Sequence, residues 1–171
     1  MPDLKNYDNS VALANANKRN AIFPLLSWDI YGAFFHNLKK NHEDFLELEQ
    51  IATSYKWKLE LNLREELNEN DTIIVTNPNL EIVFASNGIL EMSGYKPNEV
   101  VGQTPKIFQG KNTSAEKRAE INVAILNQQP FEVTLINYKK DGKSYDCHIR
   151  SFPIFNKKGQ LTHFIALEKA A

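Results

Sequence analysis

The stretch Gly102-Gln-Thr-Pro-Lys-Ile-Phe-Gln-Gly110 is the most informative part of this chain of 171 residues. Its two glycines do not have the spacing of a dinucleotide-binding fingerprint. It follows two short helical patterns, the second starting at Pro97, a residue suited to the first turn of a helix. It precedes a longer helical pattern, which we expect to begin with a capping box at Thr113 and Glu116. The stretch is therefore expected to be a connection between helices.

Strand patterns flank these helices on both sides. Asn77-Pro-Asn79 is a turn signal between the first two patterns, and Asp141-Gly142 is a hairpin signal between two later ones. The order strand, strand, helices and three strands predicts an α+β fold, a five-stranded antiparallel sheet with helices on one face. The expected strands are residues 73–75, 81–85, 131–140, 143–155 and 160–168.

The first 70 residues differ in character from the rest. They carry a net charge of −3, whereas residues 71–171 carry +2. Residues 1–20 are polar, and we expect a flexible arm. Residues 21–70 are expected to be an N-terminal helical extension, with Leu48 on an apolar face and Trp57 in a second helical pattern. We place the domain boundary at Asn70, which leaves 71–171 as one domain.

Several segments of this domain resemble PAS domains of the LOV subgroup, which are light-sensing, flavin-binding modules. The similarity covers about residues 71–169 in the family's order and spacing, and it implies the PAS fold. No family resemblance is found for residues 1–70. The segments that carry the resemblance are 84–95, 102–110, 135–142, 152–156 and 162–168.

The resemblance implies a flavin pocket with altered chemistry. Pro105 stands where the LOV motif has its reactive cysteine, which implies that no cysteinyl adduct forms at this position. Gln109 and Asn137 match polar residues that contact the flavin ring. Thr104 replaces an asparagine. Lys106 replaces a phosphate-binding arginine, which keeps the charge but loses a bidentate fork.

Further positions depart from the family pattern. Cys147 replaces a second ring-binding asparagine and is a weak donor and acceptor; its simplest interpretation is a small sheet residue. Glu168 replaces the signal-carrying glutamine of the last strand, and an ionised carboxylate accepts but does not donate. Asn122 falls near a second phosphate-binding arginine, with Arg118 one turn away. Asn87 completes the expected border of the pocket.

Two functions stay open at this point. The first is a sensory PAS module that binds flavin mononucleotide (FMN) and responds to light or redox state without an adduct. The second is a ligand-free PAS domain for protein interaction or dimerisation, whose pocket is filled by side chains. In either case we expect a homodimer through the N-terminal helices and the outer sheet face, together with a downstream signalling protein. We expect no enzyme, because no catalytic constellation is legible.

Composition excludes several other classes. The net charge of −1 gives no basic field for nucleic acid. No apolar run approaches the ~20 residues that span a bilayer, and the N-terminus has no apolar signal core. One cysteine forbids an internal disulfide, and the four histidines have no spacing that predicts a metal site. A cytoplasmic protein is expected.

Overall fold

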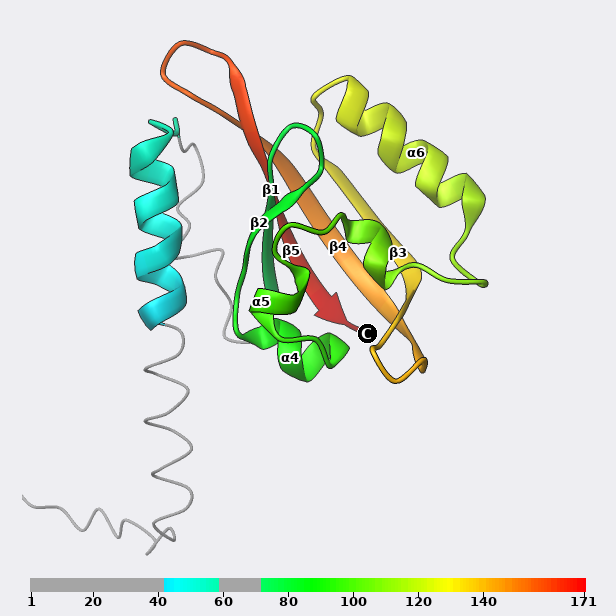
Figure 1. Cartoon of the computed structure of the whole chain (residues 1–171). Helices are drawn as coiled ribbons and strands as arrows, with labels where there is room; N and C mark the ends of the chain where they lie inside the picture. Colours follow the sequence, from blue (N-terminus) through cyan, green and yellow to red (C-terminus); the bar gives the residue numbers. More distant parts are fainter. Residues whose placement is uncertain (1–41, 59–71) are drawn as a thin grey trace, which may run out of the picture. The chain divides into compact units, whose positions relative to one another are not determined.

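The computed structural model describes residues 42–58 and 72–171, and it confirms the five-stranded antiparallel sheet. The order across the sheet is β2-β1-β5-β4-β3, so β5 is central (Figure 1). All neighbouring strands run antiparallel. The strands are β1 Thr72–Thr76, β2 Ile82–Ala85, β3 Phe131–Tyr138, β4 Ser144–Phe155 and β5 Leu161–Ala170.

Four helical segments connect β2 to β3. Helix α4 ends as predicted at Gly94, whose φ of 76° is left-handed and favours glycine. The 3₁₀ helix η1 was not predicted from the sequence. Figure 1 shows α4 and α5 beside the β1–β2 hairpin and α6 alongside β3. The segments are α4 Gly88–Ser93, α5 Pro97–Val100, η1 Pro105–Phe108 and α6 Ala115–Leu126.

The start of α6 corrects one prediction. Ser114, not Thr113, caps the helix: its hydroxyl oxygen accepts from the backbone N–H of Lys117 at 3.2 Å. Thr113 instead donates its hydroxyl to the carbonyl of Ile136 at 2.7 Å, which ties the loop to the outer edge of β3. The predicted capping box is therefore one residue early, because Thr113 finds its partner in the sheet.

Both edge strands are hydrogen-bonded on their outer side. On β3, the carbonyl of Thr134 accepts from the ammonium group of Lys117. On β2, the N–H of Ile82 donates to the carbonyl of Gln103 at 2.8 Å, and the carbonyl of Ile82 accepts from Gly102 N–H at 2.8 Å. The segment that leads into η1 is thus joined to the β2 edge.

The sheet is covered on both faces, which explains why β1 is buried along its whole length. Alternate residues of a strand face opposite sides, so two separate apolar clusters form. The cluster on the helix side comprises Ile74, Ile82, Ala85, Ile89, Val100 and Phe108. The cluster on the opposite side, which we call the outer-face cluster, comprises Leu48, Trp57, Ile73, Val75, Phe84, Ile154, Ile165 and Leu167.

Residues 42–54 form a helix, and Leu48 is its buried contribution to the outer-face cluster. Asp44 fixes the same helix to α4. Its carboxylate accepts from the backbone N–H of Asn87 at 2.8 Å and from the side-chain amide of Asn87 at 2.9 Å. Leu38–Ala171 is one compact unit, so this helix belongs with the sheet although it lies before the boundary drawn at Asn70.

Trp57 is not helical, contrary to the prediction. It forms an isolated bridge with Asn156, and its indole N–H donates to Nδ1 of His163 on β5 at 3.0 Å. This buried hydrogen bond, together with the bridge, holds the chain against the sheet after the helix has ended at residue 54. The arm at 1–20 and the helical extension at 21–41 and 59–70 lie outside the described residues. In the part of the chain that is described, no helix is long and apolar enough to cross a membrane.

Candidate functional site

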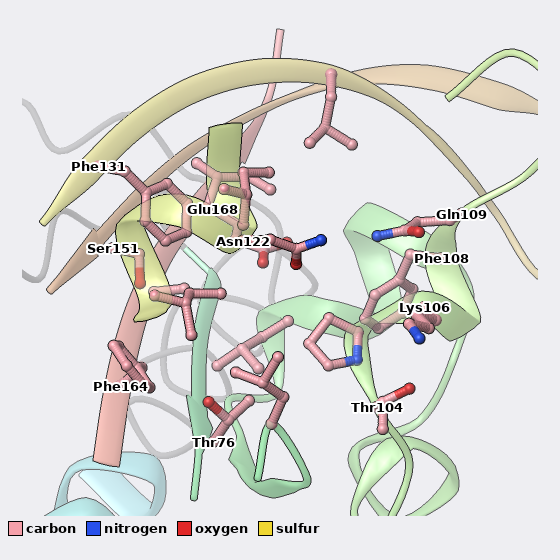
Figure 2. A pocket seen from close by; sticks show the side chains of 18 of the residues that line it. Thr76, Thr104, Lys106, Phe108, Gln109, Asn122, Phe131, Ser151, Phe164 and Glu168 are labelled. Atoms are coloured by element: carbon pink, nitrogen blue, oxygen red, sulfur yellow. The ribbon is translucent and has the colours of Figure 1, made fainter. Parts of the chain in front are cut away.

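A cavity of about 210 Å³ lies between the helix-side face of the sheet, η1 and α6. Figure 2 shows Ser151, Phe164 and Glu168 on the sheet side, with Lys106 and Gln109 on the opposite side. Most of the wall is apolar, and its polar side chains come from the sheet and the β1–β2 turn, from residues 104–109 and from α6. The apolar residues are Ile74, Leu80, Pro105, Phe108, Ile121, Ile125, Phe131, Leu135, Ile149, Phe164 and Ala166.

Helix η1 positions one end of the cavity. Pro105 is the first residue of this helix, a position whose N–H has no partner within the helix, so the N–H that proline lacks is not missed. Phe108 is 2% exposed and meets the ring of Tyr95 edge-on at 5.8 Å, which anchors the turn. The N–H of Gln109 donates to the carbonyl of Lys106 at 3.0 Å. These contacts hold the side chains of Lys106 and Gln109 at the cavity wall.

The structure places five of the seven predicted site residues on this wall: Thr104, Lys106, Gln109, Asn137 and Glu168. Asn87 is not on the wall, because both its N–H and its amide are bound to Asp44. Cys147 is not on the wall either. It is completely buried on β4, and its Sγ lies 3.5 Å from Oε2 of Glu168.

Glu168 from β5 and Asn137 from β3 both line the cavity and are both buried, and we call the part of the wall that they form the closed end. Glu168 is 5% exposed, and burial raises the pKa of its carboxyl group to about 7. Burial, followed by the charge of Glu168, raises the pKa of the Cys147 thiol well above its usual range. Cys147 is therefore a thiol at neutral pH and not a nucleophile.

Tyr145 lies beside this group on β4. Burial, followed by the charges of Cys147 and Glu168, raises the pKa of its phenol well above its usual range. Its hydroxyl is buried and has no hydrogen-bond partner within the described ranges. The hydroxyl of Tyr145, a residue that does not line the cavity, therefore has hydrogen-bonding capacity that the described part of the fold leaves unused.

A second cavity, of about 290 Å³, adjoins the first and shares Lys106, Gln109, Ile121 and Asn122 with it. Its further wall residues are Ala115, Arg118 and Ala119 of α6. Lys106 and Arg118 thus place two cations beside this second cavity. The combined space is an apolar slot with a polar closed end and a cationic mouth.

Sequence reasoning missed three polar wall residues, Thr76, Asn79 and Ser151. Strand alternation could have identified Ser151, since it shares a face of β4 with Cys147 and Ile149. The two histidines of the sheet do not meet. His148 pairs with Glu132 at 2.9 Å on the surface, whereas His163 faces Trp57. No cluster of metal ligands is present within residues 42–58 and 72–171.

Comparisons with known proteins agree with this architecture. A protein-family model described as "PAS domain" matches residues 70–169. Protein TWIN LOV 1 of Arabidopsis thaliana is 34% identical over 137 residues, which are 77% of this chain and 34% of that protein. A blue-light-activated histidine kinase of Brucella ovis is 34% identical over 97 residues, 55% of this chain and 20% of the kinase. The chain therefore spans about a third of the first relative's length and a fifth of the second's.

Solved structures show the same fold. The light-state structure of the Aureochrome1 LOV photoreceptor superposes with a TM-score of 0.58 at 22% identity, covering 66% of this chain and 89% of that one. The LOV domain of the Erythrobacter litoralis EL346 blue-light activated histidine kinase superposes with a TM-score of 0.56 at 20% identity, covering 58% of this chain and 94% of that one.

Proposed function

Because this chain belongs to the PAS domain family, we propose that its cavity binds a flavin, with FMN as the expected ligand, and that the domain is a light or redox sensor. Relatives named as LOV proteins and blue-light-activated kinases support this proposal. The observation that carries it is the shape of the site: an apolar slot with a polar closed end, which continues into a cavity lined by Lys106 and Arg118.

The donor set fits the parts of FMN. The flavin ring is flat and largely apolar with one polar edge, which suits the apolar wall and the amides of Gln109 and Asn137. The phosphate is anionic, which suits Lys106 and Arg118. Arg118 supplies the bidentate fork that Lys106 lacks. These two residues would hold the phosphate, and the amides would orient the ring.

The same residues argue for chemistry without a cysteinyl adduct. Pro105 offers no thiol at the cavity wall, and Cys147 is a buried thiol beside Glu168. A bound flavin would supply blue-light absorption and one-electron chemistry. Tyr95, Tyr138 and Tyr145 are then the candidate electron donors.

Strand β5 provides a route for the signal. Phe164, Ala166 and Glu168 face the cavity, whereas alternate residues face the other side. Among these, His163 binds Trp57, and Ile165 and Leu167 belong to the outer-face cluster with Leu48. A shift of β5 caused by the ligand would therefore alter the packing of the 42–54 helix. That helix is the proposed output element.

Absorbance spectroscopy tests the proposal. Protein mixed with FMN is expected to retain flavin absorbance after gel filtration. Riboflavin, which lacks the phosphate, is expected to bind more weakly. The double variant Lys106→Ala/Arg118→Ala should lose about 100- to 10,000-fold in FMN affinity, because each of the two lost charged hydrogen bonds costs ~1.5–3 kcal/mol. Its riboflavin affinity should not change. Failure of the wild type to take up either flavin would contradict the proposal.

One observation favours a second candidate, a ligand-free interaction domain. The first cavity, about 210 Å³, is smaller than the roughly 300–1,000 Å³ of most ligand sites. On this alternative the domain acts through association, and we propose a homodimer that uses the N-terminal region. Sedimentation of the full chain and of its compact unit, residues 38–171, tests this: a dimer only of the full chain supports it, and a full-length monomer at micromolar concentration contradicts it.

A further inference from the structure

Glu168 is a buried acid to which the fold supplies few hydrogen-bond donors. It is 5% exposed, and its one hydrogen-bond partner in the described part of the chain is the thiol of Cys147, at 3.5 Å. A thiol is a weak donor. A buried carboxylate without a strong donor or a cation is costly, and a ligand that supplies a donor would offset this cost.

Among residues 42–58 and 72–171, the surroundings of Glu168 supply no other charge partner. From β4, the titratable groups that face it are Cys147 and Tyr145, both neutral at physiological pH. From β3, the uncharged amide of Asn137 also lies on the cavity wall. On β1, the residue opposite Glu168 is Thr72. The cation of the cavity, Lys106, lies on the opposite side (Figure 2).

We propose that Glu168 makes this site selective for a ring whose edge donates a hydrogen bond toward the closed end, and therefore for reduced over oxidised flavin. The inference rests on the proposed function and adds a preference of the same site. Ring nitrogens that are bare acceptors in oxidised flavin carry hydrogen in reduced flavin. An ionised carboxylate accepts from such an N–H but repels a bare nitrogen, whereas a glutamine amide can rotate to suit either.

The preference depends on the protonation of Glu168. Once protonated, the carboxyl group can donate to a bare nitrogen, so oxidised flavin is then accepted as well. Selectivity is therefore strong when the group is ionised, above neutral pH, and weak when it is protonated. Glutamine does not titrate, so a Glu168→Gln variant should lose this pH dependence.

The test measures dissociation constants for FMN, oxidised in air and reduced anaerobically with dithionite, at about pH 6 and about pH 8.5. Wild type and Glu168→Gln are compared by equilibrium ultrafiltration, anaerobic for the reduced form, and the free flavin is quantified by fluorescence after reoxidation in air. For each protein, the dissociation constant of oxidised FMN is divided by that of reduced FMN. The wild-type ratio is then divided by the Glu168→Gln ratio at the same pH. This second division removes the pH dependence of flavin itself. Glu132→Gln, at an exposed glutamate of β3, is the matched control.

For the wild type we expect this relative ratio to be about tenfold or more at the higher pH and near one at the lower pH. A tenfold ratio raises the two-electron potential of the bound flavin by about 30 mV. Glu132→Gln should behave as the wild type. If both forms bind and the wild-type ratio equals that of Glu168→Gln at both pH values, the inference is wrong and the proposed function stands. If neither form binds either protein, both are wrong.

Discussion

The hydrogen bond between Trp57 and His163 offers the sharpest test of how the N-terminal helix is held. It joins the indole N–H to Nδ1 at 3.0 Å, with Trp57 6% exposed and His163 1% exposed. The ring of His163 also meets Tyr55 edge-on at 4.4 Å. We consider Trp57→Phe and His163→Phe, since phenylalanine keeps an aromatic ring at each site while removing the polar partner.

Each single substitution leaves one buried polar atom without a partner. The expected cost is ~1–3 kcal/mol of unfolding free energy per variant, with a further cavity cost for the smaller ring of Trp57→Phe. The double variant has no orphaned atom. It should therefore be less destabilised than the two single variants added together, by at least about 1 kcal/mol.

Urea unfolding followed by far-UV circular dichroism measures the four proteins of this cycle. The unfolding free energy of the four proteins must fall with urea concentration at the same slope, because a changed slope would indicate loss of the two-state transition. Additive costs, within about 0.5 kcal/mol, would show that the two side chains are not energetically coupled and would refute the reasoning.

The same pair predicts a pH dependence. Burial lowers the pKa of His163, so the folded state holds it neutral while the unfolded chain takes up a proton near pH ~6.5. Its contribution to stability is therefore complete above about pH 6.5 and is lost as pH falls, by at most ~1.4 kcal/mol per unit. The stability difference between wild type and His163→Phe should shrink between about pH 7.5 and about pH 5.5. A constant difference would contradict this.

Four further predictions concern other contacts. Glu168→Gln should flatten the dependence of stability on pH. The pKa of Glu168 is about 7 in the folded state and 4.5 ordinarily, so the wild type loses about 3 kcal/mol of unfolding free energy as pH rises from about 4.5 to about 7. Urea midpoints that change equally with pH in both proteins would contradict this. Asp44→Ala should cost ~1–3 kcal/mol and speed hydrogen exchange in α4, since two donors of Asn87 lose their acceptor; unchanged exchange would argue against this contact. Gly110→Ala should cost ~1–3 kcal/mol by thermal melting, because its Cβ would lie 2.5 Å from the ring of Tyr138; Tyr138→Leu in the same chain should restore part of the loss. Ser114→Ala should cost ~1 kcal/mol in the same assay, and a similar cost for Glu116→Ala would instead favour the original capping box.

The sequence predicted the fold well because its signals are local. Alternating apolar residues and turn signals such as Asp141-Gly142 and Gly94 act within a few neighbours, and the strands and α4 follow them. The 3₁₀ helix at Pro105–Phe108 was missed because four residues show no periodicity.

The candidate site was predicted less completely, since its errors involve partners far apart in the chain. Asn87 looked like a pocket residue, but its amide binds Asp44, 43 positions away. Trp57 fitted a helical pattern, but its partner His163 is 106 positions away. No local sequence pattern predicts a hydrogen bond between residues so far apart in the chain. Cys147 was expected near the ring edge, and its contact with Glu168 instead became visible only once β4 and β5 were paired.

The hydrogen bonds on the outer sides of β2 and β3 restrict how this domain can meet another protein. A peptide that adds itself to a sheet as an extra strand needs a row of free N–H and C=O groups. At β3, two such carbonyls are taken by Lys117 and Thr113, and at β2 both groups of Ile82 are taken by the segment before η1. A partner that adds a strand would have to displace these contacts, which close part of each edge. The same closure protects the sheet from the edge-to-edge aggregation to which open sheets are prone.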